Sequence, residues 1–458
     1  MEIKINDTLQ LYITDMTVNG DGIGKTEDGY PLFVGGAVPG DTVRARVTKL
    51  NKTYGFARLE KTEIPSEHRV NPPCPHFGKC GGCSIMHTDY PSQLEIKKSL
   101  VVSNLAKIGG YAEGTYGFEG IIGADKIFGY RNKAQFPVRM NAENGKAECG
   151  FYAKSSHSLV PCTDCMIQDG SINKTARIII GFINRYSLSV YDEKKHHGTV
   201  RHIYVRVGRD DSVMAAIVTN SSQRTAHADE LAQMLLGEVN LKSLVQNINT
   251  SKGNAVLGRE NLLLWGDGSI NAEIGSIEYI MSPNSFFQVN YEQMHKLYAK
   301  AKEYAALRGV ETLFDLYCGV GSISLFMADA AAKVIGVEIV EAAIDNAKLN
   351  AAKNGITNAK FFCGDCPEVV SKLVADGARA DVVIVDPPRK GCDERTLRLI
   401  GEISPDRLVY VSCNSSTLAR DVKIMRGYGY EMKKCCAVDL FPHSMHTEAV
   451  CQLVKVRK

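Results

Sequence analysis

One cysteine of this sequence stands where a thiol could act as a nucleophile. Cys413 follows the apolar run RLVYVS, and Ser415 and Ser416 behind it can cap a following helix. The dipole of such a helix favours the thiolate of a cysteine at its N-terminus. The ordinary alternative is a structural role, since most cysteines are small buried residues. We interpret Cys413 as a covalent nucleophile, because other polar residues also stand at strand ends.

Two carboxylates are candidate partners of this thiol. Asp386 follows the apolar run DVVIV and precedes two prolines, which hold its backbone extended and direct its side chain toward the end of the strand. Glu448 lies in FPHSMHTEAV, and a desolvated carboxylate can serve as a general base. A nucleophile, a base and a further acid together indicate covalent catalysis.

A small-molecule site is indicated at the ends of three other expected strands. Gly319 and Gly321 would let the backbone approach a ligand after TLFDLYC, and Glu338 ends the next strand, where it could accept hydrogen bonds from ribose hydroxyls. Asp365 follows the third strand and could bind an adenine amine. Because the chain has no GxxxxGK[ST] motif, S-adenosylmethionine fits this pattern better than ATP or NAD.

These residues are suited to methylation of uracil at C5. That carbon is a poor nucleophile, but a thiolate added to C6 produces an enolate with electron density on C5. After methyl transfer a base must remove the C5 proton, so that the thiolate can leave. The alternative is methylation of an exocyclic amine on the same fold. Arg389 argues against it, because such enzymes usually carry an aromatic residue after the two prolines.

The segments SCNSS, DPPRKG, DLYCGVGSISL, SFFQVN and FPHSMHTE resemble the RNA uracil-5-methyltransferase family over nearly the whole chain. Members of that family act on 23S rRNA or on the T-loop of tRNA. The resemblance implies that Cys413 is the nucleophile, Glu448 the base and Asp386 a hydrogen-bond partner of uracil. It also implies an S-adenosylmethionine site formed by Gln288, Tyr317, Ser322, Glu338, Asp365 and Asp386, although some relatives carry Asn at the position of Ser322.

A group of cysteines indicates a metal centre. Cys74, Cys80 and Cys83 lie in CPHFGKCGGC, and a fourth thiolate could come from Cys149, Cys162 or Cys165. Spacing alone fits a [4Fe–4S] cluster or structural zinc. The resemblance implies a [4Fe–4S] cluster with Cys165 as fourth ligand, whereas Cys162 departs from the family pattern. In the same region, GYRNKAQFPVRM with Arg131 and Lys133 is a candidate RNA-contacting strand, with surface ion pairing as the alternative.

The pattern of elements predicts an α/β protein of several domains. Turn signals between short strands predict an OB-like β-barrel over residues 1–60, which resembles a TRAM domain, followed by a proline-rich linker over 61–73. Residues 74–275 mix strands and helices in a central α+β domain, whose helix at about 91–109 could pack on the catalytic domain. Strands and helices alternate over 281–458 and predict a Rossmann-like methyltransferase domain.

Composition and charge narrow the setting and the partners. The 458 residues have a net charge of +3, and we see neither a signal peptide nor a membrane span, so we expect a cytoplasmic monomer with reduced cysteines.

The run TVRARVTKLNKTYGFARL contains no acid and interleaves basic with aromatic residues, which suits RNA, although a solvated strand edge is the alternative. The resemblance to the family implies that a chain with both the barrel and the cysteine group acts on 23S rRNA rather than on tRNA. A non-catalytic RNA-binding factor is the third alternative.

The basic side chains of the run TVRARVTKLNKTYGFARL are Arg44, Arg46, Lys49, Lys52 and Arg58.

Overall fold

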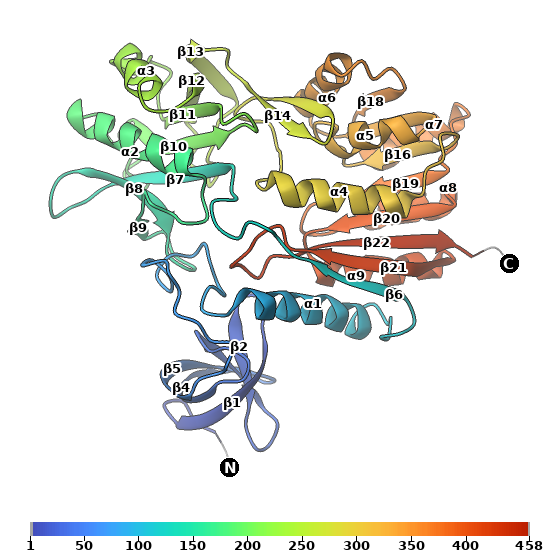
Figure 1. Cartoon of the computed structure of the whole chain (residues 1–458), viewed down its shortest axis with the longest axis horizontal. Coiled ribbons are helices and arrows are strands. Elements are labelled where there is room, and N and C mark those ends of the chain that lie inside the picture. Colours follow the sequence, from blue (N-terminus) through green and yellow to red (C-terminus); the bar gives the residue numbers. More distant parts are fainter. Residues whose placement is uncertain (1–2, 457–458) are drawn as a thin grey trace.

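The computed structural model describes residues 3–456, and its N-terminal part is a closed barrel (Figure 1). Buried and exposed residues alternate along its strands, which puts Leu11, Val34 and Val43 inside. The strands are β1 (Thr8–Met16), β2 (Asp21–Lys25), β3 (Pro31–Gly35), β4 (Thr42–Leu50) and β5 (Gly55–Ile64), in the order β1-β2-β3-β5-β4. The expected five-stranded barrel is therefore confirmed.

The central part is a seven-stranded sheet with two helices. Its strands are β7 (Lys133–Met140), β8 (Ala147–Tyr152), β9 (Leu159–Pro161), β10 (Val200–Val207), β11 (Val213–Thr219), β12 (Leu241–Ile248) and β13 (Glu260–Gly266), in the order β13-β12-β11-β10-β7-β8-β9. Helices α2 (Gly170–Arg185) and α3 (Ala228–Leu236) bury their apolar side chains against this sheet. A hairpin of β14 (Ile270–Ile274) and β15 (Ile277–Met281) leads to the catalytic part.

The C-terminal part is a mixed eight-stranded sheet in the order β18-β17-β16-β19-β20-β22-β21-β6. Five neighbouring strands are parallel: β16 (Thr312–Leu316), β17 (Lys333–Glu338), β18 (Ala359–Cys363), β19 (Val382–Val385) and β20 (Arg407–Ser412). The others are β21 (Tyr430–Val438), β22 (Glu448–Lys455) and β6 (Gly117–Ile122). From β16 the chain adds β17 and β18 on one side and then returns to add β19 and β20 on the other side. At such a switch point α/β sheets bind ligands beyond the strand ends.

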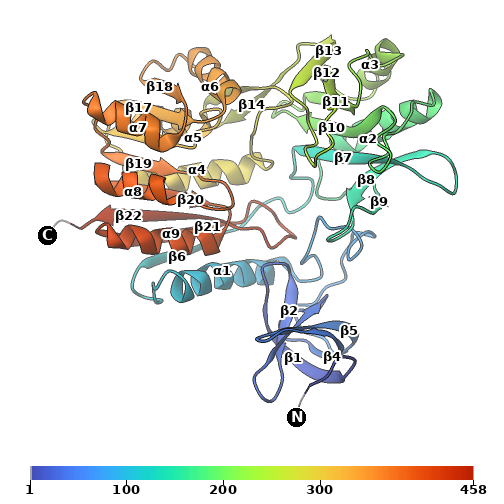
Figure 2. The ribbon, with the colours of Figure 1, turned by 180° about the vertical axis from the view of Figure 1, so that it is seen from behind.

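Helices cover both faces of this sheet, because successive residues of its strands point to opposite sides. On β19, Ile384 packs into the core under α4, and Val383 and Val385 pack into the core on the opposite face. The helices are α4 (Tyr291–Ala305), α5 (Ser322–Met327), α6 (Glu341–Lys353), α7 (Cys366–Ala375), α8 (Glu394–Ile403) and α9 (Ser415–Gly427), with a short 3₁₀ turn at Ala328–Ala330. Figure 1 shows α4 in front of the sheet, and Figure 2 shows α7, α8 and α9 in front of its other face.

Two elements from the first third of the chain complete the catalytic sheet. Helix α1 (Tyr90–Lys107) packs on α9, and β6 pairs in parallel with β21 at the sheet edge (Figure 2). Both lie in the stretch that the sequence pattern joins to the central domain. Val101 and Leu105 of α1 are fully buried in the same core as Leu418 of α9, so apolar burial holds this segment in place.

Candidate active site

The parallel strands bring most of the expected site residues to one edge of the sheet. Tyr317, Asp365 and Asp386 each follow a strand directly or closely, Glu338 ends β17, and Cys413 follows β20. Parallel neighbours end at the same edge, so these residues lie together at the edge where sheets with this strand order bind ligands in a crevice. Glu448 is the first residue of β22, which pairs antiparallel with β20, and it therefore lies at the same edge beside Cys413.

The cofactor side of the crevice has an oriented carboxylate. Glu338 accepts hydrogen bonds from the backbone N–H groups of Gly319 at 3.2 Å and Val340 at 3.0 Å. Gly319 and Gly321 have φ of 54° and 78°, and a Cβ on Gly321 would stand 3.1 Å from Ala347 and Phe361. Glycine therefore lets the turn after β16 pass close to α6. This turn and carboxylate form the kind of cradle that the sequence pattern predicts.

Other expected cofactor residues lie around this turn. The Tyr317 hydroxyl is 3.0 Å from the Thr396 hydroxyl, and the Ser322 hydroxyl, at the start of α5, is 2.9 Å from the hydroxyl of buried Tyr298. Asp365 pairs with Arg395 at 3.2 Å. Gln288 lies between β15 and α4, where its backbone carbonyl accepts a hydrogen bond from Asn132.

Cys413 lies in a loop that is tied to the loop of Asp386. Asn414 caps α9, and its side-chain amide also donates to the backbone carbonyl of Arg389 at 3.1 Å. Burial and the carboxylates of Glu448 and Asp386 raise the pKa of the Cys413 thiol to about 11. The expected effect of the helix dipole is therefore outweighed, and free Cys413 is protonated at neutral pH.

The carboxyl groups around Cys413 share its buried setting. Burial raises the pKa of Asp386 to about 7, and burial together with the charge of Asp386 raises that of Glu448 to about 8. A carboxyl with such a pKa is protonated and deprotonated in the neutral range, which suits a general base. Arg389 partly opposes these shifts, because its positive charge lowers the pKa of Glu448 and of Cys413.

Sequence reasoning missed Asp315, which belongs to the same acidic group. It is fully buried in β16, accepts a hydrogen bond from Ser324 at 2.5 Å, and has its pKa raised to about 7, chiefly by burial. An acid within the apolar run TLFDL was the available signal, since acids are rarely buried without a specific role. Nothing in the sequence near Tyr298 pointed to its place in the crevice.

The loops that carry Asp386 and Cys413 are held together by Asp421 of α9. This buried carboxylate accepts hydrogen bonds from the Tyr410 hydroxyl at 2.6 Å and from the backbone N–H of Cys392 at 2.9 Å. Arg420 beside it donates to the backbone carbonyls of Lys390 and Cys392. The loop after β19 is therefore anchored to the helix that follows Cys413, which fixes Asp386 relative to the thiol.

Helix α1 anchors the segment that leads to Glu448. Lys97 and Asp439 form a fully buried ion pair at 2.5 Å, and the Tyr90 hydroxyl donates to Asp439 at 2.9 Å. Gln93 accepts a hydrogen bond from the backbone N–H of His443 at 2.9 Å. Buried polar groups that are paired in this way allow one arrangement of the chain, so residues 439–447 enter β22 at a defined position.

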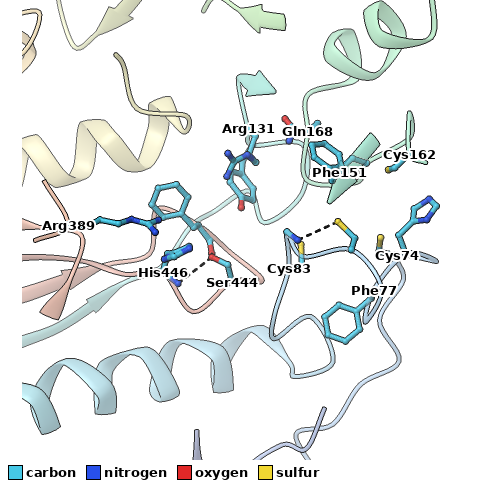
Figure 3. A pocket seen from close by; sticks show the side chains of 16 residues that line it. Cys74, Phe77, Cys83, Arg131, Phe151, Cys162, Gln168, Arg389, Ser444 and His446 are labelled. Carbon is cyan, nitrogen blue, oxygen red and sulfur yellow. Dashed lines mark hydrogen bonds between the residues drawn. The ribbon is translucent and has the colours of Figure 1, made fainter. Parts of the chain in front are cut away.

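Five cysteines line one cavity of about 310 Å³ (Figure 3). They are Cys74, Cys80, Cys83, Cys162 and Cys165. Cys149 does not line it and is buried in the core of the central sheet. The backbone N–H of Gly82 donates to the Cys80 sulfur at 3.4 Å. The three cysteines of CPHFGKCGGC thus line the same cavity as Cys162 and Cys165, which are two of the three candidates for a fourth ligand.

Among residues 3–456, only one group of three or more His, Cys, Asp or Glu side chains has all its ligand atoms within 4.8 Å of one another. It consists of His76, Cys162 and Asp164, with Asp164 largely exposed. Cys74, Cys80, Cys83 and Cys165 do not converge this closely in the described chain. Cys165 is nonetheless near the other thiols, because its charge is among those that raise the pKa of Cys83 to about 12, mainly a result of burial.

Comparison with known proteins identifies the family. Residues 222–456 match the family model tRNA (Uracil-5-)-methyltransferase, and residues 4–59 match the TRAM domain. An RNA methyltransferase of Clostridium tetani is 41% identical over 98% of this chain and 96% of its own length. The chain belongs to the tRNA (uracil-5-)-methyltransferase family. It is thus an RNA methyltransferase rather than a non-catalytic RNA-binding factor.

Two further relatives extend this methyltransferase comparison. An RNA methyltransferase of Listeria innocua is 42% identical over 98% of both chains. The crystal structure of the Pyrococcus abyssi tRNA (uracil-54, C5)-methyltransferase in complex with S-adenosyl-L-homocysteine has a TM-score of 0.76, with 27% identity over 97% of this chain and 100% of that one. The expected combination of TRAM barrel and methyltransferase domain is confirmed.

No helix among residues 3–456 of this methyltransferase is long and apolar enough to cross a membrane.

The TRAM barrel of this methyltransferase neutralises part of its basic run. Arg44 and Arg46 of β4 pair with Glu63 and Glu60 of the neighbouring strand β5, at 3.6 and 2.6 Å. The stretch is free of acid only along the sequence, because strand pairing brings acids beside it. Lys49, Lys52 and Arg58 form no ion pair within the described residues.

Three aromatic rings lie beside these unpaired cations. Tyr54 stacks on Phe33 with ring centroids 5.1 Å apart, and Phe56 meets both rings edge-on at 5.7 Å. Tyr54 is exposed on the outer face of the barrel. Exposed rings beside cations suit the bases and phosphates of RNA.

We predict that Asp386→Asn will make Cys413 more reactive in this methyltransferase. The carboxylate of Asp386 raises the pKa of the thiol, so its removal lowers that pKa and increases the thiolate fraction, about tenfold per pKa unit. Alkylation of Cys413 by iodoacetamide between pH 7 and 10, followed by peptide mass spectrometry, measures this. Asp365→Asn, at another strand end, is the control and should leave the rate unchanged. An unchanged rate in Asp386→Asn would contradict the assigned electrostatics.

Proposed function

We propose that this protein methylates C5 of a uridine in RNA with S-adenosylmethionine, through a covalent adduct between Cys413 and C6 of uracil. The observation that carries the proposal is the position of Cys413 close enough to Asp386 and buried Glu448 for their charges to act on its thiol, at the same edge of the sheet as the oriented carboxylate of Glu338. The family supports this proposal, because it is named for methylation of uracil at position 5.

The residues of the crevice fit S-adenosylmethionine. Glu338 would accept hydrogen bonds from the ribose hydroxyls, and the glycines before α5 leave room for the ligand against the backbone. Tyr317, Ser322, Asp365 and Gln288 would complete this site. The cofactor, when bound, supplies an electrophilic methyl group.

The reaction follows from the chemistry of Cys413 and Glu448. The thiolate form of Cys413, a small fraction at neutral pH, adds to C6, and the electron pair of the C5–C6 double bond moves into an enolate, which Asp386 assists by hydrogen bonding to the uracil ring. C5 would then take the methyl group of S-adenosylmethionine, whose bond to the sulfonium sulfur would break and leave S-adenosylhomocysteine. Glu448 removes the proton left on C5, the double bond reforms, and the bond between sulfur and C6 breaks. The thiolate is regenerated, so one methyl group replaces one proton.

For the RNA target we propose 23S rRNA, with tRNA as the second candidate. The TRAM barrel together with the cysteine group supports rRNA, as the resemblance implies. The likeness to the P. abyssi tRNA (uracil-54, C5)-methyltransferase favours tRNA. Mass mapping of 5-methyluridine in rRNA and tRNA, from cells with and without the gene, decides between them. If cells without the gene keep all 5-methyluridine in both RNAs, the proposed function itself is contradicted.

We further propose that Cys74, Cys80, Cys83 and Cys165 hold a [4Fe–4S] cluster. The four thiols line one cavity of about 310 Å³, and all-thiolate ligands suit either a cluster or zinc. The resemblance to the family favours the cluster. The cluster would shape the loop structure here, and the polar reaction above does not require it.

Iron analysis tests this set of ligands. Anaerobically purified protein should contain about four iron and four sulfide ions per chain. Cys165→Ala should lose them, whereas Cys162→Ala should keep them, because the resemblance implies Cys165 as the fourth ligand. Cys162 lies beside His76 and Asp164, and its thiol is also hydrogen-bonded to that of Cys165. One tightly bound zinc ion without iron would overturn the cluster, and iron loss in the Cys162 variant would make Cys162 the fourth ligand.

Changes to the barrel test its contact with RNA. Replacing Lys49, Lys52 and Arg58 with glutamine should weaken RNA binding and flatten its salt dependence, since fewer counterions are released. Replacing Arg44 and Arg46 is the matched control and should change the slope less, because Glu63 and Glu60 already pair with them. RNA affinity across a salt series measures both. Equal slopes in all proteins would leave the basic run a solvated strand edge.

A further inference from the structure

The barrel is held in a fixed position beside the N-terminal end of α1 (Figure 1). Asp41, directly before β4, is fully buried, accepts a hydrogen bond from the backbone N–H of Ser66 at 2.9 Å and forms an ion pair with Arg69. Arg69 in turn forms a β-bridge with Thr88, two residues before α1. Because these buried polar groups are paired, the segment between the barrel and α1 fixes how the barrel is oriented.

A second contact joins the barrel to the segment before Glu448. Met16, the last residue of β1, is only 3% exposed, and it packs with Ile85 and Met445 rather than with the barrel core. Two side chains of α1 border this small apolar cluster. Burial of apolar surface stabilises the contact, so the end of β1 and the segment that leads to Glu448 are buried together.

Ser84 connects the same two parts by hydrogen bonds and close packing. Its backbone N–H donates to the carbonyl of His443 at 2.9 Å, and its hydroxyl accepts from the backbone N–H of Met445 at 3.1 Å. The turn between β1 and β2 meets Ser84 from the barrel side. There Gly20 has φ of 79°, and a Cβ on it would stand 2.8 Å from the Cβ of Ser84. Glycine therefore lets the barrel turn reach Ser84.

The segment that receives these contacts has an unusual backbone. His443 has φ of 68°, in the left-handed region that residues other than glycine seldom adopt. Its carbonyl accepts hydrogen bonds from the backbone N–H groups of Ser84 and Ile85 at 2.9 and 3.0 Å, and its own N–H donates to Gln93 at 2.9 Å. Such a conformation persists where the surroundings fix it. Contacts from outside the segment therefore set its shape, and Glu448 follows it.

We propose that the barrel takes part in the reaction by positioning Glu448, with Met16 and Ser84 as the positioning residues. They act through Met445 and His443, which come three and five residues before the base. The inference rests on the proposed function, because that function assigns removal of the C5 proton to Glu448. The barrel then serves two steps through different residues: RNA binding through its basic run, and proton removal through Met16.

Proton removal is the step that depends on this positioning. Methyl transfer uses Cys413 and the cofactor residues, which the parallel strands hold in place. Glu448 begins β22 and is reached through the segment that Met16 and Ser84 contact. A displacement of a reacting group by about 1 Å can cost about 10²-fold in rate. Loss of the barrel contact should therefore slow the second step and leave the first nearly unchanged.

Two labels followed in one reaction separate these steps. Transcripts of 23S rRNA and of tRNA made with 5-tritiated uridine release tritium into water when the C5 proton is removed. S-adenosylmethionine with a carbon-14 methyl group labels the RNA when the methyl group is transferred. Rapid-quench single turnovers of the full-length protein give both rates.

Three variants are compared with the wild type: Met16→Ala, Ser84→Ala and the control Lys154→Met. Lys154 binds Asp21 of the same barrel turn at 2.9 Å, so its variant removes a contact of the barrel that does not involve the segment before Glu448. Met16 lies in β1, so its variant tests the contact without a change next to Cys83, which Ser84 follows.

We expect the ratio of tritium release to methyl transfer to fall about tenfold in Met16→Ala and in Ser84→Ala, because the base is displaced while the nucleophile is not. Lys154→Met should keep the wild-type ratio. A variant that is partly unfolded lowers both signals equally and leaves the ratio unchanged, so the ratio reports positioning rather than stability.

An unchanged ratio in both Met16→Ala and Ser84→Ala would overturn the positioning role and leave the barrel an RNA-binding part alone. An equal fall in Lys154→Met would overturn it too, because any weakened attachment of the barrel would then have the same effect. Failure of the proposed function gives a different result, in which the wild type neither transfers a methyl group to C5 nor releases tritium.

Discussion

Cys413→Ala will abolish both turnover and covalent capture of RNA. RNA that contains 5-fluorouridine, incubated with S-adenosylmethionine and wild-type protein, will form a stable adduct, since fluorine on C5 cannot leave as a proton. The alanine variant has no sulfur to add to C6, so no adduct forms, and turnover of normal RNA falls by at least about 10³-fold. Denaturing gels of protein with labelled RNA measure the adduct.

A second cysteine variant makes this result specific. Cys363→Ala removes an exposed thiol at the end of β18 and should leave adduct formation as in the wild type. Cofactor binding by Cys413→Ala should also be retained, because Glu338 and the turn after β16 are unchanged. An undiminished adduct in Cys413→Ala would show that another group is the nucleophile.

Glu448→Gln will stall the reaction after methyl transfer. The variant keeps Cys413 but cannot remove the proton from C5, so protein–RNA adduct will accumulate with ordinary uridine RNA. Turnover should fall by about 10²- to 10⁴-fold, the usual contribution of a general base. Glu431→Gln is the control, because it changes a carboxylate on the neighbouring strand β21 and breaks only an exposed ion pair with Arg426 of α9. Slow turnover without adduct would mean that another group takes the proton.

The pH dependence gives this prediction a second readout. Burial and Asp386 raise the pKa of Glu448 to about 8, so below that pH the free protein carries it mainly protonated and unable to accept a proton. Release of the adduct in wild type should therefore quicken as pH rises from 7 to 9. The glutamine variant has no carboxyl at this position and should lack that rise.

The strand-end residues could be predicted because the signals are local. An apolar run followed by a polar residue identifies the end of a strand, and parallel neighbours place such ends at one edge. Strand pairing places Cys413, Asp386 and Glu338 at one edge of the sheet, and the five-stranded barrel follows from its turns. The assignment of catalytic roles to these residues stays a prediction until the variants are measured.

What the sequence could not reveal depends on distant pairing. The register of β4 against β5 brings Glu60 to Arg46, and no local pattern encodes that register. The pKa of Cys413 depends on Glu448, which reaches it only through the pairing of β22 with β20. The local sequence therefore predicts the helix after Cys413, which would lower the pKa of the thiol. It does not predict that Glu448 and Asp386 lie near enough to raise that pKa.

The long-range pairing of α1 and β6 affects how the protein folds as it is synthesised. Lys97 and Asp439 are separated by 342 residues, and β6 must wait for β21 to be made. Domains made early can fold while the ribosome continues, but contacts of such high order form only when the last segment emerges. The strand that carries Glu448 is near the C-terminal end of the chain. A nascent chain whose barrel has already folded therefore has no completed active site until β22, which carries Glu448, has been made and has paired with β20.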